Sequence, residues 1–158
     1  MPASTPSRPI RRRSVGRVLL VVLVVALGAV AAPSGAAVAA PTAPGSQTFR
    51  NPNTYLIPDL VTVSSPITST LTGTVPSVVR AAVNIQHTYI GDLRVQLVAP
   101  DGVVFTLHNR TGGAANDLIA TYTVNASGRP AGGTWILRIR DMAPLDVGYL
   151  RAWSITFP

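Results

Sequence analysis

Apolar and polar residues alternate along most of this chain from residue 79 onward. Residues 79–87 read VRAAVNIQH, so every second position from Val79 through Val83 and Ile85 is apolar or small. The same alternation appears in four further segments, at residues 93–99, 103–108, 135–140 and 153–157. A period of two places one set of side chains on one face of a β-strand. These segments, together with residues 118–124, are predicted to be half-buried strands.

Turn-forming residues separate the predicted strands. Pro100-Asp101-Gly102 lies between two alternating segments, and a Pro/Gly-rich stretch spans residues 128–133. Asp-Gly between two such segments predicts a β-hairpin, because both residues tolerate a positive φ. No helical period occurs outside the first 40 residues. Short strands with turns between them predict an all-β fold, either an antiparallel sandwich or a barrel.

The first 39 residues have a different character. Five arginines lie near the start, at Arg8, Arg11, Arg12, Arg13 and Arg17. They precede an uncharged apolar run over residues 18–32, and Ala37-Val38-Ala39 follows. A basic region, a short apolar core and an A-x-A site are typical of a helical secretory signal peptide. We therefore expect residues 1–39 to direct export from a bacterial cell, with cleavage after Ala39 or Ala40.

A membrane anchor is the alternative interpretation of this segment. A spanning helix needs about 20 apolar residues. The run reaches that length only by crossing Pro33-Ser34-Gly35, which breaks helices. We expect contact with a membrane only through the signal peptide, and only where it stays uncleaved.

The net charge changes once the signal peptide is set aside. Of 13 basic residues, all arginine, eight remain against six aspartates, which gives a net charge of +2. These eight arginines are scattered singly in the sequence, so no basic stripe for nucleic acid is expected. The chain has no cysteine, and disulfides cannot staple it. Residues 40–47 are predicted to be a flexible leader, and residues 48–158 the folded domain.

Several separated motifs resemble the proprotein convertase P domain, also called the Homo B domain. Residues 83–102, VNIQHTYIGDLRVQLVAPDG, resemble its opening pattern, and residues 133–137 its Gly-x-Trp-x-Leu. Ile57-Pro58-Asp59 and the closing series from Asp141 to Phe157 also match in order. The resemblance implies a jelly-roll-like antiparallel β-sandwich of eight or nine strands over residues 48–158. It also implies a protein partner, either a subtilisin-like serine protease that the domain stabilises or the substrate of that protease.

Three functional hypotheses follow from this resemblance. Only a signal and a leader precede Thr48, so the first expects an exported, non-catalytic accessory module that binds a protein. The second is a part in a serine endopeptidase system, with the catalytic domain acting in trans or lost from this chain. The third is a calcium-dependent adhesion or carbohydrate-binding module, for which Trp135 and Trp153 would have to be exposed. Core packing is the favoured interpretation of both tryptophans.

The sequence offers little for catalysis. It has two histidines, His87 and His108, and no Gly-x-Ser-x-Gly motif. We expect His87 to be structural, bound to the backbone or to an aspartate, and His108 to lie at the surface or in a loop. A composite triad of His87, Asp92 and a serine is the alternative, which only geometry can decide. No catalytic residue is assigned.

Asp92, Asp141 and Asp146 are the candidate metal ligands. Each lies at a strand end beside a glycine or a loop. Carboxylate and carbonyl oxygens are the ligands that Ca²⁺ prefers, so calcium is the candidate cofactor. The alternative is that these aspartates cap turns through hydrogen bonds to the backbone.

Overall fold

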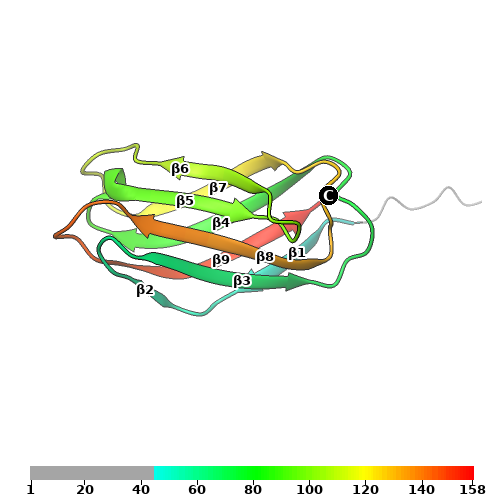
Figure 1. Cartoon of the computed structure of the whole chain (residues 1–158), viewed down its shortest axis with the longest axis horizontal. Helices are drawn as coiled ribbons and strands as arrows, with labels where there is room; N and C mark the ends of the chain where they lie inside the picture. Colours follow the sequence, from blue (N-terminus) through cyan, green and yellow to red (C-terminus); the bar gives the residue numbers. More distant parts are fainter. Residues whose placement is uncertain (1–44) are drawn as a thin grey trace, which may run out of the picture. The chain divides into compact units, whose positions relative to one another are not determined.

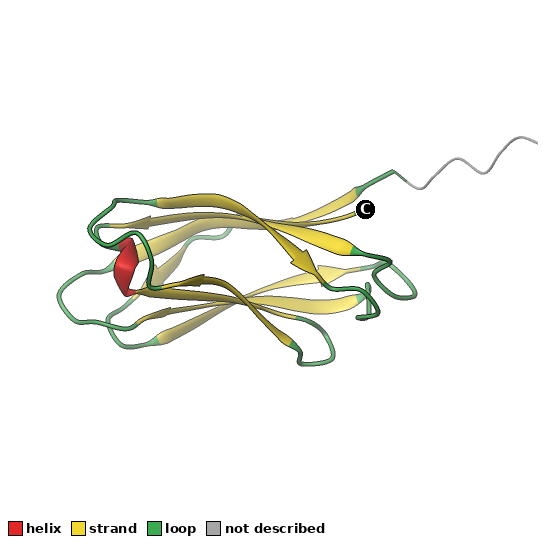
Figure 2. Cartoon of the chain, turned by 90° about the horizontal axis from the view of Figure 1, so that it is seen from above, coloured by secondary structure: helices red, strands yellow, loops and turns green. Residues whose placement is uncertain are grey.

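The computed structural model describes residues 45–158, which form two antiparallel sheets packed face to face (Figures 1 and 2). Nine strands make up the sheets, which confirms the predicted antiparallel β-sandwich of eight or nine strands. The predicted signal peptide and residues 40–44 of the predicted leader lie outside the described residues. Within the described part, no helix is long and apolar enough to cross a membrane.

The first sheet has the order β1-β9-β4-β7, and β2 also pairs with β9. Its strands are β1 (Gln47–Asn51), β2 (Tyr55–Ile57), β4 (Val78–His87), β7 (Leu118–Asn125) and β9 (Gly148–Phe157). The second sheet has the order β3-β8-β5-β6. Its strands are β3 (Thr62–Ser69), β5 (Leu93–Val98), β6 (Val104–Asn109) and β8 (Gly133–Asp141). The chain crosses repeatedly between the sheets, which is the jelly-roll arrangement.

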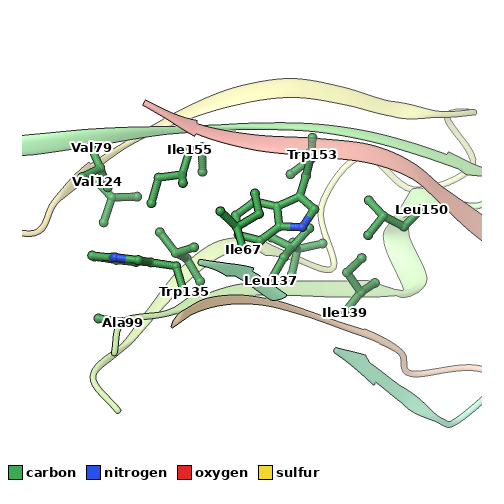
Figure 3. Close-up of a cluster of buried hydrophobic side chains, with 14 of the residues drawn as sticks. Ile67, Val79, Ala99, Val124, Trp135, Leu137, Ile139, Leu150, Trp153 and Ile155 are labelled. Carbon is green, nitrogen blue, oxygen red and sulfur yellow. The ribbon is translucent and has the colours of Figure 1, made fainter. Parts of the chain in front are cut away.

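The core fills the space between the two sheets (Figure 3). Trp135 on β8 is fully buried and Trp153 on β9 is 2% exposed, so both pack in the core as predicted. The Trp135 ring meets Phe157 edge to face, with ring centroids 5.7 Å apart. Edge-to-face pairs add to the stabilisation that burial provides. Because both indoles are covered, they do not offer the exposed stacking surface that a carbohydrate-binding module needs.

The predicted hairpin joins β5 to β6, with a turn that differs from the expected one. The Gly102 N–H donates to the Ala99 carbonyl at 2.9 Å, and Gly102 has a φ of +86°. Asp101 keeps a negative φ, unlike the pair of left-handed residues that Asp-Gly suggested. Pro100 explains the difference, because its ring fixes φ near −65° and favours a type I turn followed by a left-handed glycine.

Four connections gather at one end of the sandwich, which we call the loop end (Figure 1). They link β2 to β3, β4 to β5 through the short 3₁₀ helix η1 (Ile90–Asp92), β6 to β7, and β8 to β9. The Ile90 N–H donates to the Ala115 carbonyl at 3.1 Å, and the Gly91 N–H to the Gly113 carbonyl at 2.9 Å. These bonds fasten the β6–β7 connection to η1. The loop end thereby brings together segments that are far apart in the sequence.

Candidate functional site at the loop end

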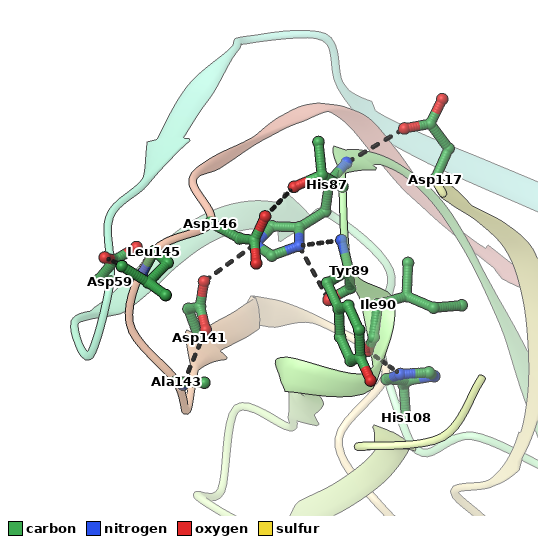
Figure 4. Close-up of polar contacts among 11 residues, drawn as sticks. Asp59, His87, Tyr89, Ile90, His108, Asp117, Asp141, Ala143, Leu145 and Asp146 are labelled. Atoms are coloured by element: carbon green, nitrogen blue, oxygen red, sulfur yellow. Dashed lines mark hydrogen bonds and ion pairs between the residues drawn. The ribbon is translucent and has the colours of Figure 1, made fainter. Parts of the chain in front are cut away.

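A buried histidine–aspartate pair anchors the loop end (Figure 4). His87 Nε2 donates to Asp141 Oδ2 at 2.9 Å, and both side chains are fully buried. His87 ends β4 and Asp141 ends β8, so the pair ties one sheet to the other. His87 Nδ1 lies 3.0 Å from the Tyr89 carbonyl oxygen. The prediction of a structural histidine, bound to the backbone and to an aspartate, is therefore confirmed.

His108 lies elsewhere than predicted. Its exposed fraction is 7%, and its Nε2 donates to the Ile90 carbonyl at 2.9 Å. The prediction of a surface position was wrong because β6 contains a bulge opposite Val95 and Gln96. A bulge adds one residue to a strand and changes the face of the residues that follow.

No Ser-His-Asp arrangement exists within residues 45–158. The carboxylate on His87 belongs to Asp141 rather than Asp92, and no serine is among the hydrogen-bond partners of either histidine. A serine nucleophile needs a histidine base within hydrogen-bond reach. The composite triad is therefore not assembled in the described part of the chain.

Of the three candidate metal ligands, Asp141 and Asp146 accept hydrogen bonds from different groups. Asp141 Oδ1 accepts the Ala143 N–H at 3.0 Å, which caps the turn after β8. Asp146 accepts the hydroxyl of Thr88. Asp92 is half-buried at the end of η1. Over residues 45–158, no three acidic, histidine or cysteine side chains gather as a metal site. Both Asp141 oxygens already accept a hydrogen bond, one from the His87 ring and one from the Ala143 N–H.

Two aspartates that sequence reasoning left unassigned also hold the loops. Asp59 Oδ2 accepts the Leu145 N–H at 2.8 Å, which ties the β2–β3 loop to the β8–β9 loop (Figure 4). Asp59 Oδ1 is buried without a hydrogen-bond partner among the described residues. Asp117 Oδ1 accepts the His87 N–H at 3.1 Å. The Ile-Pro-Asp motif could have identified Asp59 from the sequence. No motif in the sequence points to Asp117.

Residues 45–158 expose ten large apolar side chains. Six of these side chains lie on two segments of the loop end. We call this set the loop-end patch, and it comprises Leu56, Leu60, Val61, Leu145, Val147 and Tyr149. β2 pairs with the start of β9, with Leu56 opposite Tyr149. The Asp59–Leu145 hydrogen bond joins the same two segments. Such concentrations of exposed apolar surface mark sites of protein interaction.

Two leucines of the patch adopt an unusual backbone conformation. Leu145 has a φ of +91° and is 92% exposed, and Leu60 has a φ of +58° and is 54% exposed. A positive φ costs a residue with a branched side chain roughly 1–3 kcal/mol. Neither leucine recovers that cost by being buried. Non-glycine residues in such conformations cluster at functional sites.

A hollow of about 260 Å³ borders the patch. Val147 and Tyr149 line one part of it, and Asn116 and Asp117 line another. A second hollow, of about 410 Å³, lies over the outer face of the first sheet, where small residues such as Ala82 leave space. The first hollow adds polar groups and a carboxylate beside the apolar surface. That combination suits the recognition of a protein surface.

The strand order and the loop-end geometry define a jelly-roll β-sandwich that exposes apolar side chains at one end. The family model of the proprotein convertase P-domain matches residues 76–157. The chain belongs to this family, as the motifs of its sequence implied.

Three similar proteins contain a region that matches this domain. Leupeptin-inactivating enzyme 1 of Streptomyces exfoliatus is 54% identical over 120 residues, which cover 74% of this chain and 27% of that enzyme. Transglutaminase-activating metalloprotease of Streptomyces mobaraensis is 42% identical over 118 residues, covering 73% of this chain and 16% of the relative. A calcium-dependent protease of Trichormus variabilis is 39% identical over 87 residues, covering 49% of this chain and 13% of the relative. The chain thus spans less than a third of each relative.

A solved structure shares the fold. The serine protease of Aeromonas sobria superposes with a TM-score of 0.56 at 20% identity, over 70% of this chain and 27% of that one. The relatives named above include a metalloprotease and a calcium-dependent protease. The P domain therefore occurs in bacterial proteases that include a metalloprotease, which is broader than the subtilisin-like association that the resemblance implied.

Proposed function

We propose that this chain is an exported accessory module that docks on the catalytic domain of a protease through the loop-end patch and stabilises it. The observation that carries the proposal is the pair Leu60 and Leu145, both exposed and both at positive φ. An exposed side chain with a strained backbone adds nothing to the stability of its own domain. Contact with a partner gives these positions a reason to be leucine.

The relatives support a protease as the occupant of the patch. Two of them are named as proteases and a third as an enzyme that inactivates leupeptin, and in each the matched region is a minor part. A domain that occurs beside a catalytic domain in one polypeptide has a natural partner in such a domain. The basic and apolar segment of residues 1–39 supports export. The alternative, a part in proteolysis with the catalytic domain in trans, uses the same surface.

The polar framework beneath the patch supports docking without rearrangement. The His87–Asp141 pair and the Asp59–Leu145 hydrogen bond fix the loops that carry the apolar side chains. A surface that is already ordered loses less conformational entropy on binding. The patch therefore suits a stable complex.

Replacing Leu60 and Leu145 with asparagine tests the docking surface. Asparagine tolerates a positive φ better than leucine, so the double variant should fold with equal or slightly greater stability. Its affinity for the catalytic part of the Streptomyces exfoliatus enzyme, the portion outside the matched region, should fall at least tenfold, or about 1.4 kcal/mol. Isothermal titration calorimetry measures both affinities.

Ile119→Asn is the matched control for that experiment. Ile119 is 70% exposed but lies on β7, outside the patch. This variant should bind as the unchanged chain does. Equal losses in the control and in the Leu60/Leu145 double variant would contradict docking at the loop end.

We also propose that the loop end takes Ca²⁺ through Asp59 and Asp146 rather than through Asp92 and Asp141. The buried Oδ1 of Asp59 lacks a hydrogen-bond partner among the described residues, and Asp59 is bonded to Leu145, the neighbour of Asp146. An unpartnered buried carboxylate oxygen is costly, and oxygen ligands suit Ca²⁺. One relative is named a calcium-dependent protease. A bound ion would add rigidity to the loops that carry the patch.

Thermal unfolding with and without calcium tests this second proposal. Ca²⁺ at 100 times its dissociation constant should stabilise the chain by about 2.7 kcal/mol. Asp59→Asn and Asp146→Asn should abolish the response, and Asp92→Asn should retain it. An identical thermal midpoint in excess Ca²⁺ and in excess chelator would refute the proposal.

A further inference from the structure

Three arginines converge on the outer face of the second sheet. Arg94, Arg138 and Arg140 line a hollow of about 200 Å³ together with Thr62 and Gln96. In the β5–β8 pairing, Arg94 lies opposite Arg140, and Gln96 lies opposite Arg138. Because strand side chains alternate between faces, all four point to the same side. Three of the eight arginines that are scattered singly in the sequence therefore lie together in space.

This cluster, which we call the arginine face, lacks neutralising carboxylates. The close contacts between basic and acidic side chains within residues 45–158 are His87–Asp141 and Arg129–Asp101, and neither includes an arginine of the face. Like charges directly opposite on neighbouring strands destabilise a sheet. The fold therefore holds a concentration of positive charge that its own residues do not offset.

Arg94 adds a second, independent observation. Its Nε is buried and has no hydrogen-bond partner among the described residues. Buried donors without a partner are rare in folded proteins and costly. An anion in the hollow would relieve the repulsion between the guanidinium groups, and a small movement of the Arg94 side chain would let this donor reach the anion as well.

We propose that the arginine face is a binding site for a doubly charged tetrahedral oxyanion, a phosphate or sulfate group. One guanidinium fork already matches the two oxygens of a carboxylate. Three guanidinium groups around one hollow suit a group with four acceptor oxygens and two negative charges. The Thr62 hydroxyl and the Gln96 amide supply further donors at the rim. The group could arrive as a free ion or as an ester on a larger molecule, and its chemistry at the site is the same.

Calorimetric titration of the purified chain with inorganic phosphate at constant ionic strength tests the site. We expect saturable binding of one ion, at least tenfold tighter than the binding of acetate. Phenyl phosphate distinguishes the sources, because tighter binding of the ester indicates a phosphate on a larger molecule, and tighter binding of phosphate indicates the free ion. Binding of acetate as tight as that of phosphate, or no saturable heat with either phosphate compound, would overturn the proposal.

Charge-removing substitutions place the binding on this face. Arg140→Gln should weaken phosphate binding at least tenfold. Arg140→Lys should give a smaller loss, because it keeps the charge but not the fork. Arg80→Gln, on the exposed side of β4 in the other sheet, is the matched control and should bind phosphate normally. Far-ultraviolet circular dichroism verifies that each variant is folded, and unchanged affinity in folded Arg140→Gln would refute the site.

Discussion

Replacing Asp141 with alanine is expected to lower the free energy of unfolding by about 3–5 kcal/mol, because each buried hydrogen-bonding group that the change leaves without a partner costs about 1–3 kcal/mol. The Asp141 carboxylate is fully buried against the His87 ring, and it also caps the Ala143 N–H. Its removal leaves a buried imidazole and a backbone donor without partners. A single domain is stable by only about 5–15 kcal/mol, so this one change removes a large part of the total. Urea denaturation followed by circular dichroism measures the loss.

Asp101→Ala is the matched control for this substitution. Asp101 pairs with Arg129 at 3.0 Å, but the pair is partly exposed. Exposed pairs contribute about 0–1 kcal/mol. Losses of equal size in the two variants would contradict the structural role of the buried pair. In a double-mutant cycle with His87→Leu, Asp141→Leu should cost much less than it does alone, because the buried imidazole is then absent and only the Ala143 N–H loses its partner.

Replacing Trp135 with alanine is expected to have a similarly large effect, a loss of about 3–5 kcal/mol. The indole is fully buried, meets Phe157 edge to face, and donates from Nε1 to the Ala131 carbonyl at 3.3 Å. The substitution opens a cavity between the sheets and leaves the Ala131 carbonyl without this donor. The urea midpoint should fall with an unchanged slope, which indicates lost stability rather than a changed denatured state.

Val104→Ala controls for the removal of apolar surface as such. Val104 is 44% exposed on β6, and surface substitutions usually change stability by no more than about 0.5 kcal/mol. The urea midpoint of Trp135→Phe should fall between those of Trp135→Ala and Val104→Ala, because an aromatic ring remains in the core. A Trp135→Ala midpoint no lower than that of Val104→Ala would show that the indole is not part of the core.

The alternating strands were the predictable part of this fold. β4, β5, β7 and β8 carry apolar residues at every second position and lie where the pattern placed them. β9 begins at Gly148, before its predicted segment 153–157, because a register shift opposite Asn84 and Ile85 interrupts its alternation. One face of each strand packs against the opposite sheet, so burial imposes the period that the sequence displays. The hairpin between β5 and β6 followed from its turn residues.

The first three strands escaped sequence analysis for physical reasons. The inward positions of β3 include Ser65 and Ser69, which are buried but polar and so hide the alternation. Ser65 accepts hydrogen bonds from Asn51 and from the Trp153 indole, which satisfies it in the core. Pro66 also argues against a strand, but β3 is an edge strand, where proline is tolerated. β2 has three residues, too few to show a period.

The candidate site was predictable only in part. The structural role of His87 followed from its place on an apolar strand face next to a turn. Its partner Asp141 lies 54 residues away, and only the packing of one sheet on the other brings the two together. The arginine face depends likewise on strand register, which places Arg94 opposite Arg140. The loop-end patch depends on loop conformations, and no periodic pattern encodes those.

Docking through the loop end should stabilise the catalytic domain of a protease. The most direct measurement is the half-life of thermal inactivation of the catalytic part of the Streptomyces exfoliatus enzyme, with the chain added in trans. We expect a longer half-life with the unchanged chain and with Ile119→Asn, and no extension with the Leu60→Asn/Leu145→Asn double variant. A half-life that the unchanged chain leaves the same, or that the double variant extends equally, would rule out stabilisation through the loop-end patch.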